Sequence, residues 1–263
     1  MEQNFLLDNG VYNILKFKSG ELHVTDCSIN STTIDITGSV FGSDNLIELL
    51  LLVDAIRRID NNTIINLTMP YCAYARQDRV SNIGEALSSK VFANIINSLE
   101  LNSITTWDNH SDVMTALLNN CINLSKVELT KNLNFGQFQY LVSPDAGANK
   151  QVNELSKITG IPVIRADKIR DTKTGEIKET VVYCDNLIKA NCLIVDDICQ
   201  GGRTFTELAK ALKKKNAGYI TLYTTHAFFD NGIEELVKSG INNFITTQSI
   251  PQQHMKSNRI SIL

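Results

Sequence analysis

The strongest constraint on the fold is the regular alternation of short β-rich runs with amphipathic helical segments along the chain. We expect strands at residues 33–41, 63–67, 103–106, 140–142, 163–166, 180–183, 191–195, 219–225 and 244–247. We expect helices at residues 44–60, 84–98, 111–118, 150–159, 204–215 and 233–239. Because strands that alternate with helices usually form parallel sheets, the series predicts an α/β fold of mostly parallel sheets flanked by helices.

The length of the chain, 263 residues, is that of one large or two small domains. Two sheets of modest size fit this length better than one. The connection at 131–138 (KNLNFGQF) is polar and contains Gly136, so it is the expected boundary. We therefore predict an N-terminal domain over residues 1–136 and a C-terminal domain over residues 137–263.

Composition argues against several classes of protein. The net charge of −3 implies no general attraction to nucleic acid, so any anion site must be local. The strongest apolar run, at 46–53, is far shorter than the roughly 20 residues needed to span a bilayer. The N-terminus lacks the basic start and apolar stretch of a signal peptide. None of the six cysteines forms a CxxC pair, which favours reduced thiols in a cytoplasmic protein.

The most informative local feature is the run LIVDDICQGGRTFTELAKAL at residues 193–212. An apolar strand delivers two adjacent carboxylates, Asp196 and Asp197, and a glycine pair then precedes the helix expected from Thr204. Carboxylates accept hydrogen bonds from vicinal ribose hydroxyls, while glycine N–H groups and a helix N-terminus favour a phosphate. The run therefore predicts a site for a phosphorylated sugar, although a plain turn with solvated acids gives the same local pattern.

Three further polar clusters follow predicted strands. The run at 76–79 (RQDR) can bind the phosphates and base of a nucleotide, or it can be a solvated charge run. His110, in the segment 107–110, can contact a metal or a phosphate, or be a structural histidine. Asp145 can hold Mg²⁺, which prefers carboxylate oxygen and water, or it can cap a helix.

Taken together and in this order, these clusters resemble the phosphoribosyl pyrophosphate synthetase (ribose-phosphate diphosphokinase) family. The matching stretches are FKSGELHV (17–24), DNLIELLLLVDAIRR (44–58), MPYCAYARQDR (69–79), WDNH (107–110), VSPDAGA (142–148), DKIR (167–170), LIVDDICQGGRT (193–204), TTHAFF (224–229) and TTQSIP (246–251). The resemblance implies two phosphoribosyltransferase-like domains, with ATP on the side of the first and the ribose-phosphate loop in the second. It also implies a homo-oligomer, a dimer or higher.

The resemblance implies a role for each matching residue. The residues expected to contact ATP are Phe17, Ser19, Glu21, Arg76, Gln77 and His110. The residues expected to contact a metal ion are His110 and Asp145. The expected catalytic residues are Lys168 and Arg170, in a flexible lid at 167–178. The residues expected to bind ribose phosphate are Asp196, Asp197, Gln200, Gly201, Gly202, Arg203 and Thr204.

The activity that the resemblance implies is transfer of pyrophosphate from Mg-ATP to the anomeric hydroxyl of ribose 5-phosphate, with release of AMP. The 200–204 loop departs from the family pattern, and two of the changes alter its charge. Gln200 stands where the family usually has an acid, and Arg203 stands where it usually has glycine. Both changes add local positive charge, which suits a larger anion such as the diphosphate of ADP-ribose.

Three functions therefore remain open. The first is transfer to ribose 5-phosphate. The second is the same transfer to ADP-ribose, giving an ADP-ribose pyrophosphate for NAD⁺ resynthesis. The third is a non-catalytic regulatory paralogue. Retention of Lys168, Arg170, His110 and Asp145 argues against the third.

Overall fold

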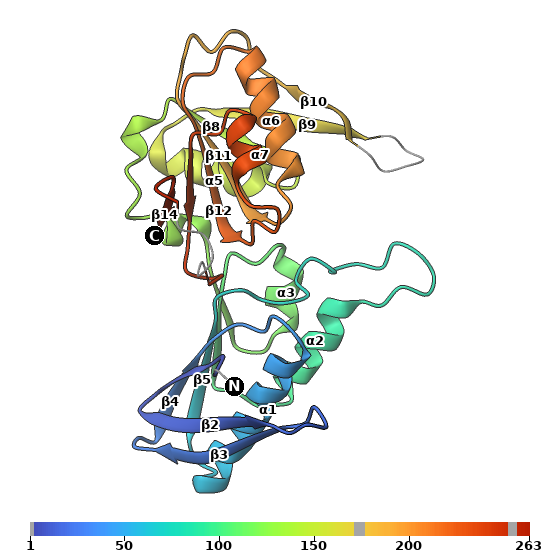
Figure 1. Cartoon of the computed structure of the whole chain (residues 1–263), viewed down its shortest axis with the longest axis vertical. Coiled ribbons are helices and arrows are strands. Elements are labelled where there is room, and N and C mark those ends of the chain that lie inside the picture. The colour runs from blue at the N-terminus through green and yellow to red at the C-terminus, as the bar shows by residue number, and fades with distance from the viewer. Residues whose placement is uncertain (1–2, 171–176, 252–256) are drawn as a thin grey trace. The chain divides into compact units, whose positions relative to one another are not determined.

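The computed structural model describes residues 3–170, 177–251 and 257–263 (Figure 1). The chain forms two compact units, Met1–Leu124 and Ser125–Leu263. The division falls before residues 125–136, which the sequence analysis placed in the N-terminal domain. The reason lies in α4 (Lys126–Leu129) and the 3-10 helix η1 (Phe135–Gln137), because Val127 and Phe135 pack against a buried cluster of the C-terminal unit.

The N-terminal unit is built on a sheet whose described strands follow the order β1-β4-β5-β6-β7. Strand β1 runs antiparallel to β4, and the other neighbours are parallel. The strands are β1 (Leu6–Asp8), β4 (Thr33–Thr37), β5 (Ile64–Met69), β6 (Ser103–Trp107) and β7 (Cys121–Leu124). The helices of this unit are α1 (Ser43–Ile59), α2 (Ser88–Asn97) and α3 (Asp112–Leu117).

Alternation along the strands separates the two faces of this sheet. Ile34 and Ile36 are fully buried, in the same cluster as the apolar residues of α1 and α2. Asp35, which lies between them, is exposed, and its carboxylate accepts a 2.8 Å hydrogen bond from the side-chain amide of Asn66. Because successive side chains of a strand point to opposite faces, α1 and α2 cover the apolar face and the other face carries polar groups.

A hairpin of β2 (Gly10–Lys16) and β3 (Leu22–Ile29), which the sequence analysis did not assign, packs against α1. Tyr12 and Ile14 are its buried members, and their neighbours along β2 are exposed. Between the strands, Phe17 N–H donates a 2.8 Å hydrogen bond to the carbonyl of Glu21, and Gly20 adopts a φ of 98°. The left-handed backbone at Gly20 explains why a glycine closes this turn.

The C-terminal unit contains a sheet whose described strands follow the order β10-β9-β8-β11-β12-β13-β14, with β10 antiparallel to β9 and the other neighbours parallel. The strands are β8 (Tyr140–Ser143), β9 (Val163–Arg170), β10 (Ile177–Val182), β11 (Cys192–Cys199), β12 (Ile220–Ala227), β13 (Asn243–Thr246) and β14 (Ile260–Ile262). Besides α4, the helices are α5 (Asn149–Thr159), α6 (Arg203–Lys214) and α7 (Glu234–Lys238). Mostly parallel strands alternate with helices in both units, which confirms the predicted α/β class.

Helices cover both faces of this second sheet. Ile194 of β11 belongs to the same buried cluster as Leu208 of α6, whereas Leu193 belongs to the cluster that contains Val152 and Leu155 of α5. Figure 1 shows α6 and α7, which contact each other, on this unit. A run of buried residues such as Cys192 to Val195 of β11 is expected where a parallel sheet has helices on both sides.

Two element boundaries differ from expectation for clear reasons. Helix α2 begins at Ser88 rather than at 84, because the Glu85 carboxylate accepts hydrogen bonds from the backbone N–H groups of Ser81 and Asn82 and closes a turn. Strand β11 runs on to Cys199 because its pairing with β12 continues that far. Within the described ranges, no helix has the length and apolar character to cross a bilayer.

Candidate functional site

Two adjacent carboxylates near the carboxyl end of β11 form the centre of the candidate site in the C-terminal unit. Asp196 and Asp197 lie within the strand rather than after it, because β12 pairs alongside them. The Asp196 carboxylate accepts a 3.0 Å hydrogen bond from the N–H of Asp197, and the Asp197 carboxylate accepts one of 2.9 Å from the N–H of Ile198. Asp197 is 9% exposed. Local hydrogen bonds therefore hold both carboxylates at the edge of the sheet where α/β folds bind ligands.

Charged neighbours act on Asp196 from several elements. Burial raises the pKa of Asp196 well above its usual range, and the negative charges of Asp197 and Asp145 raise it further. The ammonium group of Lys126, in α4, opposes that rise. Lys126 was not among the residues predicted from the sequence, because nothing in a short segment shows that a lysine will be buried.

Asp145 lies in the turn between β8 and α5, in the same unit. Its carboxylate accepts hydrogen bonds from the backbone N–H groups of Gly147 (3.0 Å) and Ala148 (3.2 Å). The Ser143 hydroxyl donates a 3.1 Å hydrogen bond to the carbonyl of Asp145. Since α5 starts at Asn149 with Ala148 at its N-cap, Asp145 closes the preceding turn rather than capping the helix. Its carboxylate is fixed by the backbone and half-buried.

The predicted ribose-phosphate loop connects β11 to α6. Gly202 occupies the N-cap of α6 in a left-handed conformation, with a φ of 77°, so Arg203 rather than Thr204 is the first helical residue. Gln200, Gly201 and Arg203 are exposed. A glycine N-cap has no side chain to occupy the first N–H groups of the helix, and such groups favour an anion. The loop thus joins β11 to α6 as expected, although the helix begins one residue earlier than predicted.

The predicted catalytic residues lie on the hairpin of β9 and β10. Lys168 is opposite Thr180 in the register, and Arg170 is opposite Ile177. The central part of the predicted lid, residues 171–176, and the side chains of Lys168 and Arg170 lie outside the described part of the chain. Their proposed roles therefore rest on the resemblance of the DKIR motif to the corresponding motif of the family named above.

A buried polar network at the carboxyl ends of β12 and β13 was not assigned a role from sequence. Nδ1 of His226 lies 2.8 Å from the hydroxyl of Ser249, and that hydroxyl also donates a 2.8 Å hydrogen bond to the carbonyl of Thr225. Thr247 donates a second 2.8 Å hydrogen bond to the same carbonyl. His226 is 3% exposed and is paired in register with Ile198, near the loop that connects β11 to α6. The motifs TTHAFF and TTQSIP were the available signal for this network.

In the N-terminal unit, the predicted nucleotide residues follow the carboxyl ends of β5 and β6, which are neighbouring parallel strands. Arg76 and Gln77 are exposed in the segment after β5, where the carbonyl of Gln77 accepts a hydrogen bond from the N–H of Ser89. His110 is exposed just after β6. Asp108, which precedes it, is buried and has a φ of 44°. The fold thus brings both segments to one edge of the first sheet.

The remaining residues expected to contact ATP lie at the tip of the β2–β3 hairpin. Phe17 is 49% exposed, and its ring stacks on that of His23 with centroids 6.3 Å apart. The hydroxyl of Ser19 donates a 2.7 Å hydrogen bond to the carboxylate of Glu21. An exposed aromatic ring on a turn is available to a ligand or to another protein surface.

The two predicted metal contacts, His110 and Asp145, belong to different units. Among the residues described, no group of three or more His, Cys, Asp or Glu side chains is arranged to hold a metal ion. A protein cage for a metal is therefore not part of the described site. Mg²⁺ that is held mainly by substrate phosphates needs one or two carboxylates, and Asp145 fits that smaller requirement.

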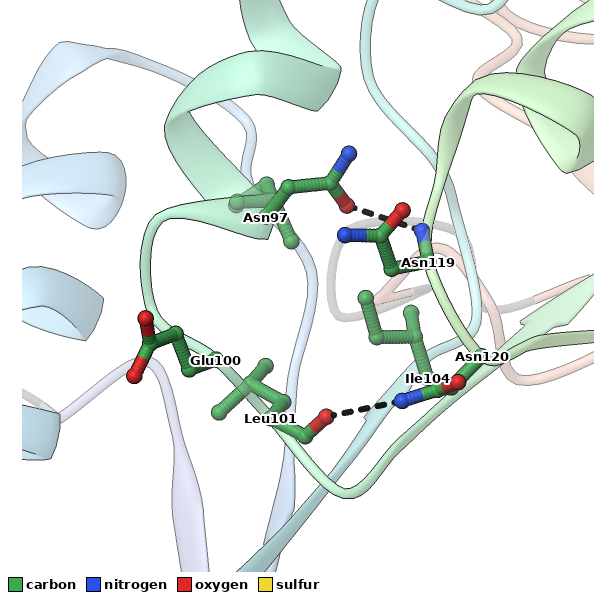
Figure 2. A pocket seen from close by; sticks show the side chains of 7 residues that line it. Asn97, Glu100, Leu101, Ile104, Asn119 and Asn120 are labelled. Atoms are coloured by element: carbon green, nitrogen blue, oxygen red, sulfur yellow. Dashed lines mark hydrogen bonds between the residues drawn. The ribbon is translucent and has the colours of Figure 1, made fainter.

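A cavity of about 240 Å³ lies at the opposite end of the first sheet, before the starts of β6 and β7. Figure 2 shows Asn97 and Asn119 joined by the hydrogen bond from the N–H of Asn119 to the Asn97 side-chain oxygen, which is 2.9 Å long. The side-chain amide of Asn120 donates to the carbonyl of Leu101. None of the predicted site residues lines this cavity, so it is separate from the candidate site.

The fold and the polar clusters together define an α/β protein with two sheet-based units and, in the second, a glycine-containing loop between a strand that carries two carboxylates and a helix N-terminus. The crystal structure of phosphoribosylpyrophosphate synthetase from Mycobacterium smegmatis has the same fold, with a TM-score of 0.81 at 20% identity. The similarity covers 97% of this chain and 86% of that one.

Sequence comparison gives the family. The family model of the N-terminal domain of ribose phosphate pyrophosphokinase matches residues 2–99. A ribose-phosphate pyrophosphokinase from Ureaplasma parvum is 30% identical over 239 residues, which covers 88% of this chain and 72% of the relative. One from Cereibacter sphaeroides is 33% identical over 216 residues, covering 79% of this chain and 63% of the relative. The chain belongs to the ribose-phosphate pyrophosphokinase family, a family of transferases.

Proposed function

We propose that the protein transfers the pyrophosphoryl group of ATP to the anomeric hydroxyl of ribose 5-phosphate and releases AMP. The observation that carries the proposal is the order of groups along β11 and α6. Asp196 and Asp197 offer carboxylates for ribose hydroxyls, and the glycine N-cap of α6 offers backbone N–H groups for the 5-phosphate a few residues later. One strand–loop–helix unit can therefore hold both ends of a ribose phosphate.

To catalyse this reaction, the protein must align ATP with the acceptor and neutralise the negative charge of the phosphates. The anomeric hydroxyl gives up its proton to solvent as its oxygen attacks the β-phosphorus of ATP, the bond from that phosphorus to the oxygen of the α-phosphate breaks, and AMP leaves. No covalent intermediate with the protein is needed. We propose that Lys168 and Arg170, on the β9–β10 hairpin, neutralise the negative charge that spreads over the transferred group.

The nucleotide side of the reaction is assigned to the N-terminal unit. We propose that Arg76, Gln77 and His110, which follow the carboxyl ends of neighbouring strands, contact the ATP phosphates and base. Arginine suits this role because its planar guanidinium matches phosphate oxygens. Phe17, Ser19 and Glu21 are proposed to contact the adenine from the hairpin tip.

Mg²⁺ is proposed as the cofactor, with Asp145 as a carboxylate ligand and His110 as a further contact. When bound to ATP, the ion supplies neutralisation of the phosphate charge. The fit rests on Asp145, whose carboxylate is half-buried and fixed by the N–H groups of Gly147 and Ala148. A fixed carboxylate with water and phosphate partners is the kind of environment that Mg²⁺ takes.

Ribose 5-phosphate is favoured over ADP-ribose as the acceptor, because the names of the similar proteins refer to ribose phosphate. Two exposed residues of the β11–α6 loop, Gln200 and Arg203, are the observations that bear on ADP-ribose, and Arg203 is the charged one. Arg203→Gly tests it: if arginine serves a diphosphate, the variant should lose ADP-ribose turnover more than ribose 5-phosphate turnover. If the variant loses turnover equally with both acceptors, Arg203 gives no support for ADP-ribose as the acceptor.

The exposed Phe17 at the hairpin tip is consistent with a homo-oligomer in which one subunit completes the adenine site of another, and we propose such an assembly. We also propose a cytoplasmic location. The six cysteines, Cys27, Cys72, Cys121, Cys184, Cys192 and Cys199, are free thiols in the structure, which suits a reducing compartment.

The decisive experiment is incubation of the protein with Mg-ATP and each acceptor in turn, followed by mass measurement of the products. We expect AMP together with ribose 5-phosphate carrying an added pyrophosphate. The double variant Asp196→Asn/Asp197→Asn should lose this activity, whereas Lys131→Ala, at an exposed lysine of the same unit, should keep it. Absence of AMP with both acceptors would show that the proposed activity is wrong.

A further inference from the structure

Lys126, the first residue of α4, is a buried lysine beside the candidate site. It is 3% exposed. Lysine is rarely buried to this extent unless its ammonium group is paired, because removing a charge from water is costly. The burial of Lys126 therefore indicates that its ammonium group has a role besides packing.

The local structure holds Lys126 firmly. The Ser125 hydroxyl accepts a hydrogen bond from the N–H of Glu128, and the Glu128 carboxylate accepts one of 2.7 Å from the N–H of Ser125, so a capping box fixes the start of α4. Nζ of Lys126 donates a 2.5 Å hydrogen bond to the side-chain oxygen of Gln151, in α5. The ammonium group thus connects α4 to the helix that follows the Asp145 turn.

Three carboxyl groups come from elements that pack near the start of α4, where Val127, the residue after Lys126, packs against the buried cluster that contains Val195 of β11. Asp196 and Asp197 come from β11, and Asp145 comes from the turn before α5. The charge of Lys126 lowers the pKa of Asp196 against the effects of burial and of the other two carboxylates. Like charges that share a site repel one another, and a nearby ammonium relieves that repulsion.

We propose that Lys126 is a positioning residue, whose buried ammonium balances the Asp196–Asp197 pair and keeps both carboxylates placed to accept hydrogen bonds from ribose hydroxyls. The proposal rests on the proposed function for its substrate, but the charge balance itself is a property of the protein alone. Lys126 acts through the aspartates, so its loss should weaken ribose 5-phosphate binding more than ATP binding.

The kinetic test compares Lys126→Met, which keeps most of the length of the side chain but removes the charge, with Lys126→Arg, which keeps the charge. We expect Lys126→Met to raise the KM for ribose 5-phosphate by roughly tenfold or more, with a KM for ATP within about twofold of the original. Lys126→Arg should restore much of the loss. Lys131→Met, at an exposed lysine in the segment after α4, is the matched control and should change neither constant. An unchanged KM for ribose 5-phosphate in an active, folded Lys126→Met protein would overturn the proposal.

A double-mutant cycle tests the charge balance without using activity. The urea midpoints of unfolding are measured for the original protein, Lys126→Met, Asp196→Asn and the double variant. We expect Lys126→Met to lower the midpoint less in the Asp196→Asn background, because the unbalanced carboxylate is then gone. Additive effects would overturn the proposal, even if the protein released no AMP and the proposed function failed. If Lys126→Met alone does not fold, the double variant should fold, and its failure to do so would also overturn the proposal.

Discussion

The hydroxyl group of Tyr12 donates a 2.7 Å hydrogen bond to the carboxylate of Glu48 in the core of the N-terminal unit. Tyr12 is 3% exposed and Glu48 is fully buried. The same carboxylate oxygen accepts a 3.0 Å hydrogen bond from the backbone N–H of Asn4. Glu48 therefore joins α1 to β2 and to the N-terminal segment, and the pair fixes the base of the hairpin that carries Phe17 at its tip.

Removing the Tyr12 hydroxyl should destabilise the protein. Tyr12→Phe leaves the buried Glu48 carboxylate without one of its hydrogen-bond donors, and we expect a loss of about 1–3 kcal/mol in the free energy of unfolding. Urea denaturation followed by circular dichroism measures this loss. Tyr219→Phe, at a tyrosine that is 45% exposed, is the control and should stay within about 0.5 kcal/mol. Equal effects of the two substitutions would show that the Tyr12–Glu48 bond contributes little.

The Tyr12–Glu48 hydrogen bond also leads us to predict how the stability of the protein changes at alkaline pH. Burial, together with the hydrogen bond to Glu48 and its charge, raises the pKa of Tyr12 above its usual value of 10.0. A group with a raised pKa in the folded state contributes stability that is present below the unfolded-state pKa and is lost as pH rises towards the folded-state value. The difference in unfolding free energy between the original protein and Tyr12→Phe should therefore shrink above a pH of about 10. A difference that is constant across that range would contradict the assignment.

Gly202→Ala should damage both stability and ribose 5-phosphate binding. A Cβ atom at this left-handed position would lie 3.1 Å from Cδ2 of Leu236, in addition to the backbone strain at a φ of 77°. We expect a loss of about 1 kcal/mol or more in unfolding free energy and a raised KM for ribose 5-phosphate. Gly160→Ala is the matched control, because Gly160 has a φ of 72° but open space around it, at the end of α5. That variant should lose stability while its KM values stay unchanged.

Ser249→Ala should show how much the buried network at the ends of β12 and β13 contributes to the stability of the protein. The substitution removes the partner of Nδ1 of His226 and one hydrogen bond to the carbonyl of Thr225. We expect a loss of about 1–3 kcal/mol in unfolding free energy, because two hydrogen bonds within a buried network are lost. Ser239→Ala removes a single 2.6 Å hydrogen bond to a helix carbonyl and should cost less. A smaller effect at Ser249 than at Ser239 would show that the His226 contact is unimportant.

Sequence periodicity predicted the parts of the fold that depend on local pattern. The apolar run of β11 and the apolar stripe of α1 can be recognised in the sequence, because a buried strand and an amphipathic helix each have a characteristic spacing of apolar residues. The β2–β3 hairpin was missed, although Tyr12 and Ile14 alternate with polar or exposed neighbours, because one short alternation also occurs by chance. Its burial depends on packing against α1, and a local pattern does not contain that information.

The candidate site was predictable where a motif determines backbone geometry. Gly202 is such a case, since the glycine pair predicted a helix entry without side chains, and Gly202 forms the N-cap of α6, one residue earlier than expected. Lys126 is the opposite case. Its burial depends on contacts with Gln151, which lies 25 residues away in the chain. Within the short segment SKVEL, Lys126 has the pattern of an ordinary surface lysine. Its burial could be recognised only from the packing of residues that are distant in the sequence.

The final prediction concerns Lys168, which the resemblance places among the catalytic residues. Its backbone lies in β9, opposite Thr180 of β10, so the hairpin should form without its side chain. Lys168→Ala is expected to lower kcat by roughly 10²-fold or more with little change in the KM for ribose 5-phosphate, because a charge that acts on the transferred group matters most in the transition state. Initial rates of AMP release at saturating and limiting ribose 5-phosphate separate the two constants, and circular dichroism checks the fold. Lys157→Ala, at an exposed lysine in the last turn of α5, controls for the loss of positive charge and should keep near-normal turnover. Near-normal turnover in Lys168→Ala as well would remove Lys168 from the chemistry and leave Arg170 as the candidate for that charge.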